Sequence, residues 1–258
     1  IMETKRNLKY FTTKGVNIVL LAGLAVCIIG FLMMLVIPKG NGYNFGFIVI
    51  MIGAAVAVFG SGAKSAEADI DNQIHGKIKD MPEQAQIKYE VYERNFLKIL
   101  NPVFLRGFSY EGDNVLCKKG PDHKYRTDSY NAAQLYFTQE NVYVYGKHIS
   151  LLDTSEEANY EFGGVYPFTE IDKAYIEERK IKIIGRELTI HSFGLKLKNG
   201  KDVFKFDVEY GADVDKAADD INHAAEKMTE RAAERAADKA AKRAALREMD
   251  AKKAAAAQ

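Results

Sequence analysis

The chain has 258 residues, a formal net charge of +1 and two cysteines. This length suffices for one domain with additional segments, and the near-neutral charge gives no general attraction to nucleic acid. Cys27 and Cys117 lie far apart in the sequence, which argues against a disulfide framework and against a four-ligand zinc site.

Two uncharged stretches come first in the chain. Residues 16–37 and the stretch between Lys39 and Lys64 contain no charged side chain, and each is long enough to cross about 30 Å of hydrocarbon as a helix. Turn-forming residues at 38–44 separate them. The pattern predicts a transmembrane helix hairpin at 16–62. A cleaved signal peptide is the alternative for the first stretch, and a buried helix is the alternative for the second.

Basic residues before the first stretch give an orientation for this hairpin. Lys5, Arg6, Lys9 and Lys14 precede it, whereas the connecting loop carries Lys39 alone. The bias predicts a multi-pass protein of the plasma membrane with both termini in the cytoplasm, residues 1–15 forming the cytoplasmic N-terminus.

Glycines recur at seven-residue spacing in both stretches. They are Gly23 and Gly30 in the first, and Gly46, Gly53 and Gly60 in the second. Seven residues are nearly two helical turns, so each set lies along one helix face. Small residues permit close helix contact, which predicts packing within the hairpin or between subunits. The general glycine richness of membrane helices is the alternative explanation.

Residues 63–101 have a helical pattern. Ile70, Ile74 and Ile78 form a narrow apolar stripe, which suits either a helix–helix contact or docking onto a domain. After Pro82 a second helix is predicted to reach Leu100. Its inward-facing residues would be Ile87, Val91, Tyr92, Phe96 and Leu100. We interpret 63–101 as a helical stalk and linker.

From Val103 the apolar period changes from helical to two, which predicts strands. One predicted hairpin turns at 139–141, and another turns at Asn199-Gly200, a dipeptide typical of type I′ turns. A helix is predicted from about Val214, because Val214, Ala217, Ile221, Ala224 and Met228 keep helical spacing.

Three stretches of this region resemble the pleckstrin-homology (PH) superfold, and more narrowly the GRAM and bacterial PH-like domains. They are the hairpin LYFT–VYVY at 135–145, the segment YPFTEI at 166–171 and the Asn-Gly hairpin before the last helix. The resemblance implies a seven-strand β domain with a C-terminal helix at 102–230, in a bacterial arrangement with an N-terminal helix hairpin. The expected fold is therefore a membrane-anchored α+β protein with a long Ala-rich helical tail.

In the PH family, basic residues between the first strands often hold lipid phosphates. The matching loop here is 117–126, and the resemblance implies Lys118, Lys119, Lys124 and Arg126 as candidates for binding an anionic headgroup. Asp122 within this loop departs from the phosphoinositide pattern. A solvated loop without a ligand is the alternative.

The tail at 231–258 contains neither proline nor glycine and is rich in alanine, which predicts a continuing helix. Alanine pairs recur every four residues from 232 to 245. Basic residues at 227, 231, 235, 239 and 243 form a neighbouring stripe, which suits anionic lipid or an acidic partner. A solvated, partly frayed helix is the alternative.

No catalytic or metal-binding motif is present in the sequence. The five histidines fit no metal spacing, and there is no nucleophile elbow. We therefore expect no enzymatic activity, no cofactor and no metal. The predicted function is a membrane-anchored, self-assembling scaffold or adaptor, with the lipid bilayer, further copies of the chain and an unknown cytoplasmic protein as partners, and no nucleic acid. The alternatives are a sensor of anionic lipid headgroups through 117–126 and an accessory subunit of a larger membrane complex.

Overall fold

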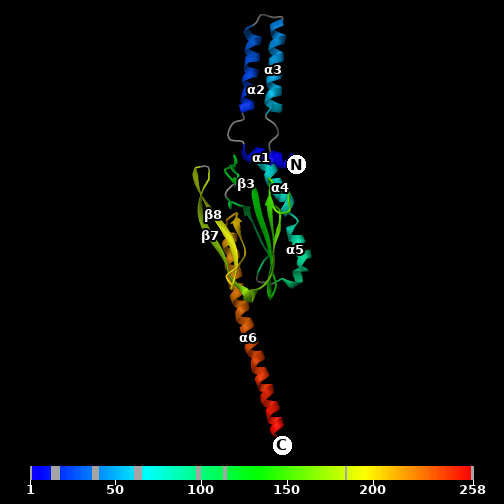
Figure 1. The fold of residues 1–258 in the computed structure, drawn as a ribbon, viewed down its shortest axis with the longest axis vertical. Helices are drawn as coiled ribbons and strands as arrows, with labels where there is room; N and C mark the ends of the chain where they lie inside the picture. The colour runs from blue at the N-terminus through cyan, green and yellow to red at the C-terminus, as the bar shows by residue number, and fades with distance from the viewer. Residues whose placement is uncertain are drawn as a thin grey trace. The chain divides into compact units, whose positions relative to one another are not determined.

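The structure is a computed structural model that describes residues 2–12, 18–36, 41–60, 66–96, 100–112, 115–183 and 185–256 (Figure 1). Side chains are described in the same ranges, except those of 18–20, 41–43, 59–60 and 246–256. The chain divides into two compact units. The first comprises Ile1–Gln73, Leu116–Asp128 and Leu151–Asp153, and the second comprises Ile74–Val115, Ser129–Ser150 and Thr154–Gln258.

The helices and strands follow one another in this order: α1 Met2–Thr12, α2 Ile18–Val36, α3 Asn41–Gly60, α4 Glu67–Ile78, α5 Met81–Tyr89, the short 3-10 helix η1 Glu93–Asn95, β1 Val103–Phe108, β2 Cys117–Lys119, β3 Tyr125–Thr127, β4 Ser129–Phe137, β5 Asn141–Ser150, β6 Glu161–Pro167, η2 Phe168–Glu170, β7 Ile171–Ile183, β8 Arg186–Leu197, β9 Asp202–Val208 and α6 Ala212–Ala256.

Glycines lie where α2 and α3 of the first unit pack side by side (Figure 1). A Cβ on Gly23 would lie 2.6 Å from the backbone nitrogen of Ala57, and a Cβ on Gly30 would lie 2.8 Å from the carbonyl oxygen of Gly46. Gly53 meets the other helix in the same way, against Cys27. The two backbones therefore approach more closely than side chains would permit. The surroundings of Gly60, the last residue of α3, lie outside what the structure describes.

The prediction of a transmembrane hairpin at 16–62 is contradicted. Among the described residues, no helix combines the length and the apolar character needed to cross a membrane. A crossing takes about 20 consecutive apolar residues. By this measure the membrane-anchored fold, the bilayer anchoring and the multi-pass plasma-membrane location predicted from the sequence are wrong. Both helices do carry exposed large apolar side chains outside their mutual contact, such as Phe31, Leu35 and Phe47.

The second unit holds two antiparallel sheets and most of the core. One sheet has the strand order β1-β4-β5-β6, and the other has the order β7-β8-β9. The inner faces supply large buried side chains, including Phe137, Phe193 and Leu195, and η2 adds Phe168. The first turns of α6 pack against β7 and η2 and bury Ile221 completely. The alternating apolar residues of the strands and the regularly spaced apolar residues of α6 therefore pack into one core.

The first sheet is covered on its outer face by α5. Tyr136 donates a hydrogen bond from its hydroxyl group to the carbonyl oxygen of Pro82, at 3.0 Å, and Tyr89 of α5 donates one to Val144, at 2.8 Å. Strand β4 is consequently buried on both faces. A tyrosine layer, rather than a purely apolar one, joins this helix to the sheet.

Helix α5 ends at Tyr89, eleven residues before the end predicted from the sequence. Glu90 adopts a left-handed conformation with φ of 50°, and its N–H bonds back to the carbonyl groups of Gln86 and Ile87. This geometry terminates a helix. Ile87 is 70% exposed and Tyr92 is 54% exposed, so the predicted inward face is wrong at these residues, whereas Val91 is buried.

The hairpin β2–β3 belongs to the first unit. The sequence placed residues 117–127 inside a single domain at 102–230. The second unit instead omits them and begins at Ile74.

Candidate functional site

Arg126, one of the four predicted headgroup ligands, is buried and engaged by two carboxylates. Its guanidinium donates to Asp71 from Nε and Nη2 at 2.8 and 2.6 Å, and to Asp122 from Nη1 and Nη2 at 3.0 and 2.8 Å. Its side chain is 3% exposed. Two bidentate pairs use four of the five N–H donors of this buried cation, which leaves one Nη1–H and no fork of donors for a phosphate.

The same contacts change the protonation of this cluster. Hydrogen bonding from Arg126 lowers the pKa of Asp122 to about 2. The hydrogen bonds to Asp71, followed by those to Asp122, raise the pKa of the guanidinium of Arg126. One cation therefore faces two anions, and the cluster carries net negative charge, which disfavours an anionic ligand.

The three lysines of this loop have different surroundings. Lys118 donates from Nζ to the carbonyl oxygen of Tyr10 at 3.0 Å and lies 4.1 Å from the centre of the Tyr10 ring. Lys119 lies 5.3 Å from the ring centre of Tyr125. Only the exposed ammonium of Lys124 has no partner among the described residues. The four predicted ligands do not converge on one site.

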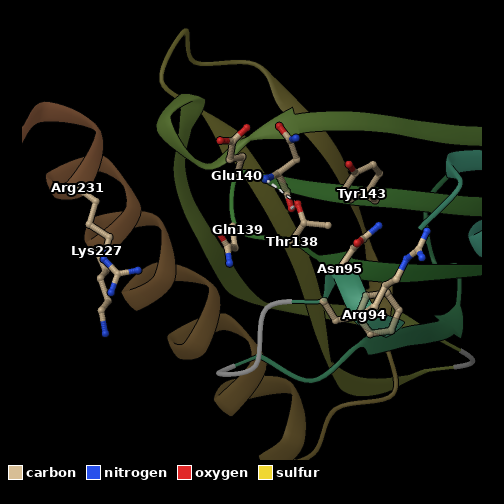
Figure 2. A pocket seen from close by; sticks show the side chains of 10 residues that line it. Arg94, Asn95, Thr138, Gln139, Glu140, Tyr143, Lys227 and Arg231 are labelled. Atoms are coloured by element: carbon tan, nitrogen blue, oxygen red, sulfur yellow. Dashed lines mark hydrogen bonds between the residues drawn. The ribbon is translucent and has the colours of Figure 1, made fainter. Parts of the chain in front are cut away.

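A different group of basic residues does converge, in the second unit. A groove of about 600 Å³ lies between α6, the β4–β5 turn and η1 (Figure 2). Ten residues line it: Arg94, Asn95, Phe96, Thr138, Gln139, Glu140, Asn141, Tyr143, Lys227 and Arg231. We call this feature the basic groove. Lys227 and Arg231 extend from α6 on one side, and the turn and η1 form the other side.

Local structure fixes each wall of the basic groove. In the turn, the backbone N–H of Thr138 donates to Asn141 at 2.9 Å, and the N–H of Phe168 donates to Glu140 at 2.9 Å. Phe96 pairs with Thr138 as an isolated antiparallel bridge and stacks on Tyr136 with ring centres 5.0 Å apart. The polar side chains of this wall therefore project from a hydrogen-bonded scaffold.

The opposite wall is set by the register of α6. Ala224 and Met228 are buried in the core, so Lys227 lies at the margin of the buried face, and Arg231 follows it one turn later. Neither cation forms an ion pair or hydrogen bond within the described part of the chain. Arg94, across the groove, contacts only the ring of Tyr92, at 5.7 Å.

The charges of the basic groove are therefore unbalanced. Three cations line it, and Glu140 is the one acidic residue among the lining residues that the structure describes. Cations kept without protein partners around a concave surface favour an anionic ligand. The sequence analysis had included Lys227 and Arg231 in the basic stripe of the tail. It missed Arg94 and Tyr143, because no local pattern connects 94, 143 and 227.

A second polar feature of this unit surrounds His148. Its Nδ1 lies 2.7 Å from Asn131 Oδ1, and its ring stacks on Tyr160 with centres 5.0 Å apart. Burial lowers the pKa of His148, so its neutral form is favoured. Because the amide oxygen of Asn131 accepts from Nδ1–H, the lone pair is on Nε2.

Within the described residues, no group of three His, Cys, Asp or Glu side chains is placed to hold a metal ion. The comparisons with known proteins give no relative from which a role can be taken: no protein-family model, no curated protein and no solved structure matches this chain.

Proposed function

We propose that this chain is a protein-binding adaptor whose basic groove holds an acidic polypeptide segment. The observation that carries this proposal is that Lys227, Arg231 and Arg94 line one groove, with no ion pair to any of them among the described residues. A partner that brings carboxylates would be steered to the groove by its charge and would form new charge-assisted hydrogen bonds there.

The groove lining favours an extended chain over a compact small molecule. Pockets for small molecules are lined mainly by apolar and aromatic side chains with a few polar ones. Here nine of the ten described lining residues carry a charge, an amide or a hydroxyl group, and only Phe96 and Tyr143 are aromatic, Tyr143 belonging to both classes. Amide and hydroxyl groups such as those of Asn95 and Thr138 suit a polypeptide backbone, which presents alternating donors and acceptors.

A lipid-headgroup sensor has less support. Its four predicted ligands are a buried carboxylate-bound arginine, two lysines that lie over aromatic rings, and Lys124, which alone has an exposed ammonium without a partner among the described residues. The resemblance to PH-like domains remains a prediction. Seven strands in two sheets, followed by a helix, support it in the second unit.

The test is a titration of the full chain into a fluorescent ten-residue peptide with five glutamates, followed by anisotropy. The variant Lys227→Gln with Arg231→Gln should bind about tenfold more weakly, because two exposed charge contacts contribute about 0.7 kcal/mol each. Arg94→Gln, on a separate element, should weaken binding about threefold. The same peptide with glutamine in place of glutamate should not bind measurably.

The matched control is Lys239→Gln with Arg243→Gln. It removes the same charge from exposed positions of the same helix outside the groove, and its affinity should stay within about twofold of the native value. If both double variants lose affinity equally, the attraction is diffuse and the groove is not the binding site. Absence of peptide binding at low salt would also refute the proposal.

A further inference from the structure

The hairpin of β7 and β8 extends beyond the sheet to which it belongs (Figure 1). The two strands pair from Ile171–Leu197 as far as Ile183–Arg186, whereas β9 pairs with β8 only between His191 and Lys196. Beyond His191 the hairpin therefore has two strands. We call residues 178–183 and 186–191 the arm. A two-stranded ribbon is marginal in water and gains stability from a third strand.

Among the residues that the structure describes, the outer edge of β7 is closed at one point. Asn222 of α6 accepts a hydrogen bond from the N–H of Ala174 at 2.7 Å, and its amide donates to the carbonyl oxygen of Ala174 at 2.9 Å. One side-chain amide thus replaces a neighbouring strand at this residue. Closing an edge in this way prevents pairing with another chain.

The same contact fixes the direction of the backbone groups along the rest of β7. The N–H and C=O of Ala174 point away from β8, and no register shift follows before Ile183. Because these groups alternate along a strand, those of residues 176, 178, 180 and 182 also point outward. Within the described residues, none of these outward groups has a protein partner. The closed point is therefore followed by an open edge.

The charges along the open edge also allow two copies to pair antiparallel with opposite charges facing each other. Glu178 precedes Lys180 and Lys182 on one face of the arm. The other face carries the partly or fully buried side chains of Ile181, Ile183, Leu188 and Ile190.

We propose that two copies of this chain pair through the open edges of β7, antiparallel, with Arg179 on the two-fold axis. Glu178 of each copy then lies opposite Lys180 of the other, and Ile176 lies opposite Lys182. Each of these hydrogen-bonded pairs exchanges two backbone hydrogen bonds, about eight in all. The two central arginines are neutralised, because each is held by Asp207 of its own chain at 2.6 Å.

Neighbouring registers are disfavoured by charge. An axis through residue 178 would place Glu178 against its own copy, and an axis through 180 would do the same for Lys180. An axis through 181 would bring Lys180 opposite Lys182 twice. Like charges directly opposite destabilise a strand pair, so the axis at Arg179 is favoured. A two-fold contact of this kind closes on itself, since one edge is used once per copy.

The test depends on register rather than mass, because the exposed apolar side chains of α2 and α3 can cause association of their own. In full-length chains with Cys27→Ala and Cys117→Ser, Glu177→Cys and Ile181→Cys are introduced separately. The proposed register places residue 177 opposite 181 with Cβ atoms about 5 Å apart, within disulfide reach. Residue 177 lies about 13 Å from its own copy.

Co-expressed Glu177→Cys and Ile181→Cys chains should form the mixed disulfide under mild oxidation at least tenfold faster than either chain forms its own. Equal rates for all three combinations, or no disulfide at all, would overturn the proposal.

A second variant separates pairing from folding. The N–H of Lys180 points outward, so Lys180→Pro removes no backbone hydrogen bond within the chain and suits an edge strand. It does remove the ion pair of the Lys180 side chain with Glu187, at 3.1 Å, and Lys180→Ala removes the same ion pair. In the cysteine chains Lys180→Pro should abolish the mixed disulfide, whereas Lys180→Ala should retain most of it. Hydrogen exchange in β8 should be the same in both, which reports an intact arm. A mixed disulfide that survives Lys180→Pro would also overturn the proposal.

Discussion

The carboxylate of Asp207 is the polar residue whose removal should cost the second unit most. It is 1% exposed, and it accepts hydrogen bonds from Arg179 Nη2 at 2.8 and 2.6 Å, from Ser192 Oγ at 2.6 Å and from the N–H of Tyr110 at 2.8 Å. These contacts join β7, β8, β9 and the segment after β1. Asp207→Asn keeps the size of the side chain and removes its charge.

The expected loss follows from what the substitution leaves behind. Removing one partner of a buried ion pair costs about 3–5 kcal/mol, because the other charge stays uncompensated. Arg179 keeps 29% of its side chain exposed and lies 3.9 Å from Glu111, so the lower end applies. The new amide also turns an NH₂ group toward a donor. We expect a loss of about 3 kcal/mol.

Native-state hydrogen exchange is the suitable assay, since a chain with two compact units has no single free energy of unfolding. Exchange of β9 amides should accelerate about 100-fold in Asp207→Asn, as a loss of about 3 kcal/mol requires. The control is Asp202→Asn on the same strand. Its exposed carboxylate accepts a bond from Tyr175, and its loss should change exchange by less than about threefold.

A third variant tests the physical reason. Replacing both partners, with Arg179→Met and Asp207→Leu, should recover at least half of the loss, because no charge then remains buried. If Asp207→Asn accelerates exchange no more than Asp202→Asn does, the ion pair does not stabilise this unit. If the double variant is worse than the single one, the cost arises from packing and the electrostatic reasoning is refuted.

Two further predictions concern other sites. Burial lowers the pKa of His148. Its neutral form therefore contributes stability that is present above the unfolded pKa of about 6.5 and is lost as the pH falls through the folded pKa. His148→Gln should reduce the change with pH, between pH 7 and 5, of the opening free energy that exchange of the β5 amides reports, and an unchanged pH dependence would contradict this. Gly53→Ala should destabilise the α2–α3 contact by about 1–3 kcal/mol, because its Cβ would lie 2.7 Å from the backbone nitrogen of Cys27. Gly76→Ala has no atom near its Cβ and should stabilise α4 by up to about 1 kcal/mol. Hydrogen exchange of α3 and α4 measures both outcomes, and similar effects at the two glycines would contradict the prediction.

Local signals in the sequence predicted several elements of the second unit. The Asn199-Gly200 dipeptide lies at the turn between β8 and β9, with Gly200 at φ of 85°. The predicted type I′ geometry is wrong, because Asn199 is not at positive φ and the N–H of Gly200 donates to the carbonyl oxygen of Leu197 at 2.8 Å. The turn at 139–141 separates β4 from β5, and the apolar spacing from Val214 predicted the buried face of α6. In each case the deciding interactions lie within a few residues of one another, so a periodicity argument can detect them.

Other features depend on contacts between distant residues. Helix α5 was predicted too long because the left-handed conformation of Glu90 that ends it gives no signal in the apolar periodicity. Arg126 was predicted as a headgroup ligand because Asp71, 55 positions earlier, cannot be recognised as its partner from the sequence. The basic groove joins Arg94 to Lys227 across more than half of the chain, and the sequence gives only the α6 half of it.

Helix α6 connects the core, the edge of β7 and the basic groove within three turns. Ile221 is fully buried, Asn222 closes the edge at Ala174, and Lys227 and Arg231 reach the groove. Since the helix is fixed by its buried face, the backbone positions of the two cations are set before any ligand binds, and only their side chains have to be ordered.

The same geometry explains why the rest of the basic stripe is not part of the groove. Four residues turn an α-helix by about 400°, so each step of four moves the side chain about 40° around the axis and about 6 Å along it. By residue 239 the stripe has rotated about 120° from Lys227 and lies about 18 Å away. Lys239 and Arg243 therefore carry the same charges as Lys227 and Arg231 but lie outside the groove. Their double variant is for this reason the control that separates binding in the groove from general attraction to a basic helix.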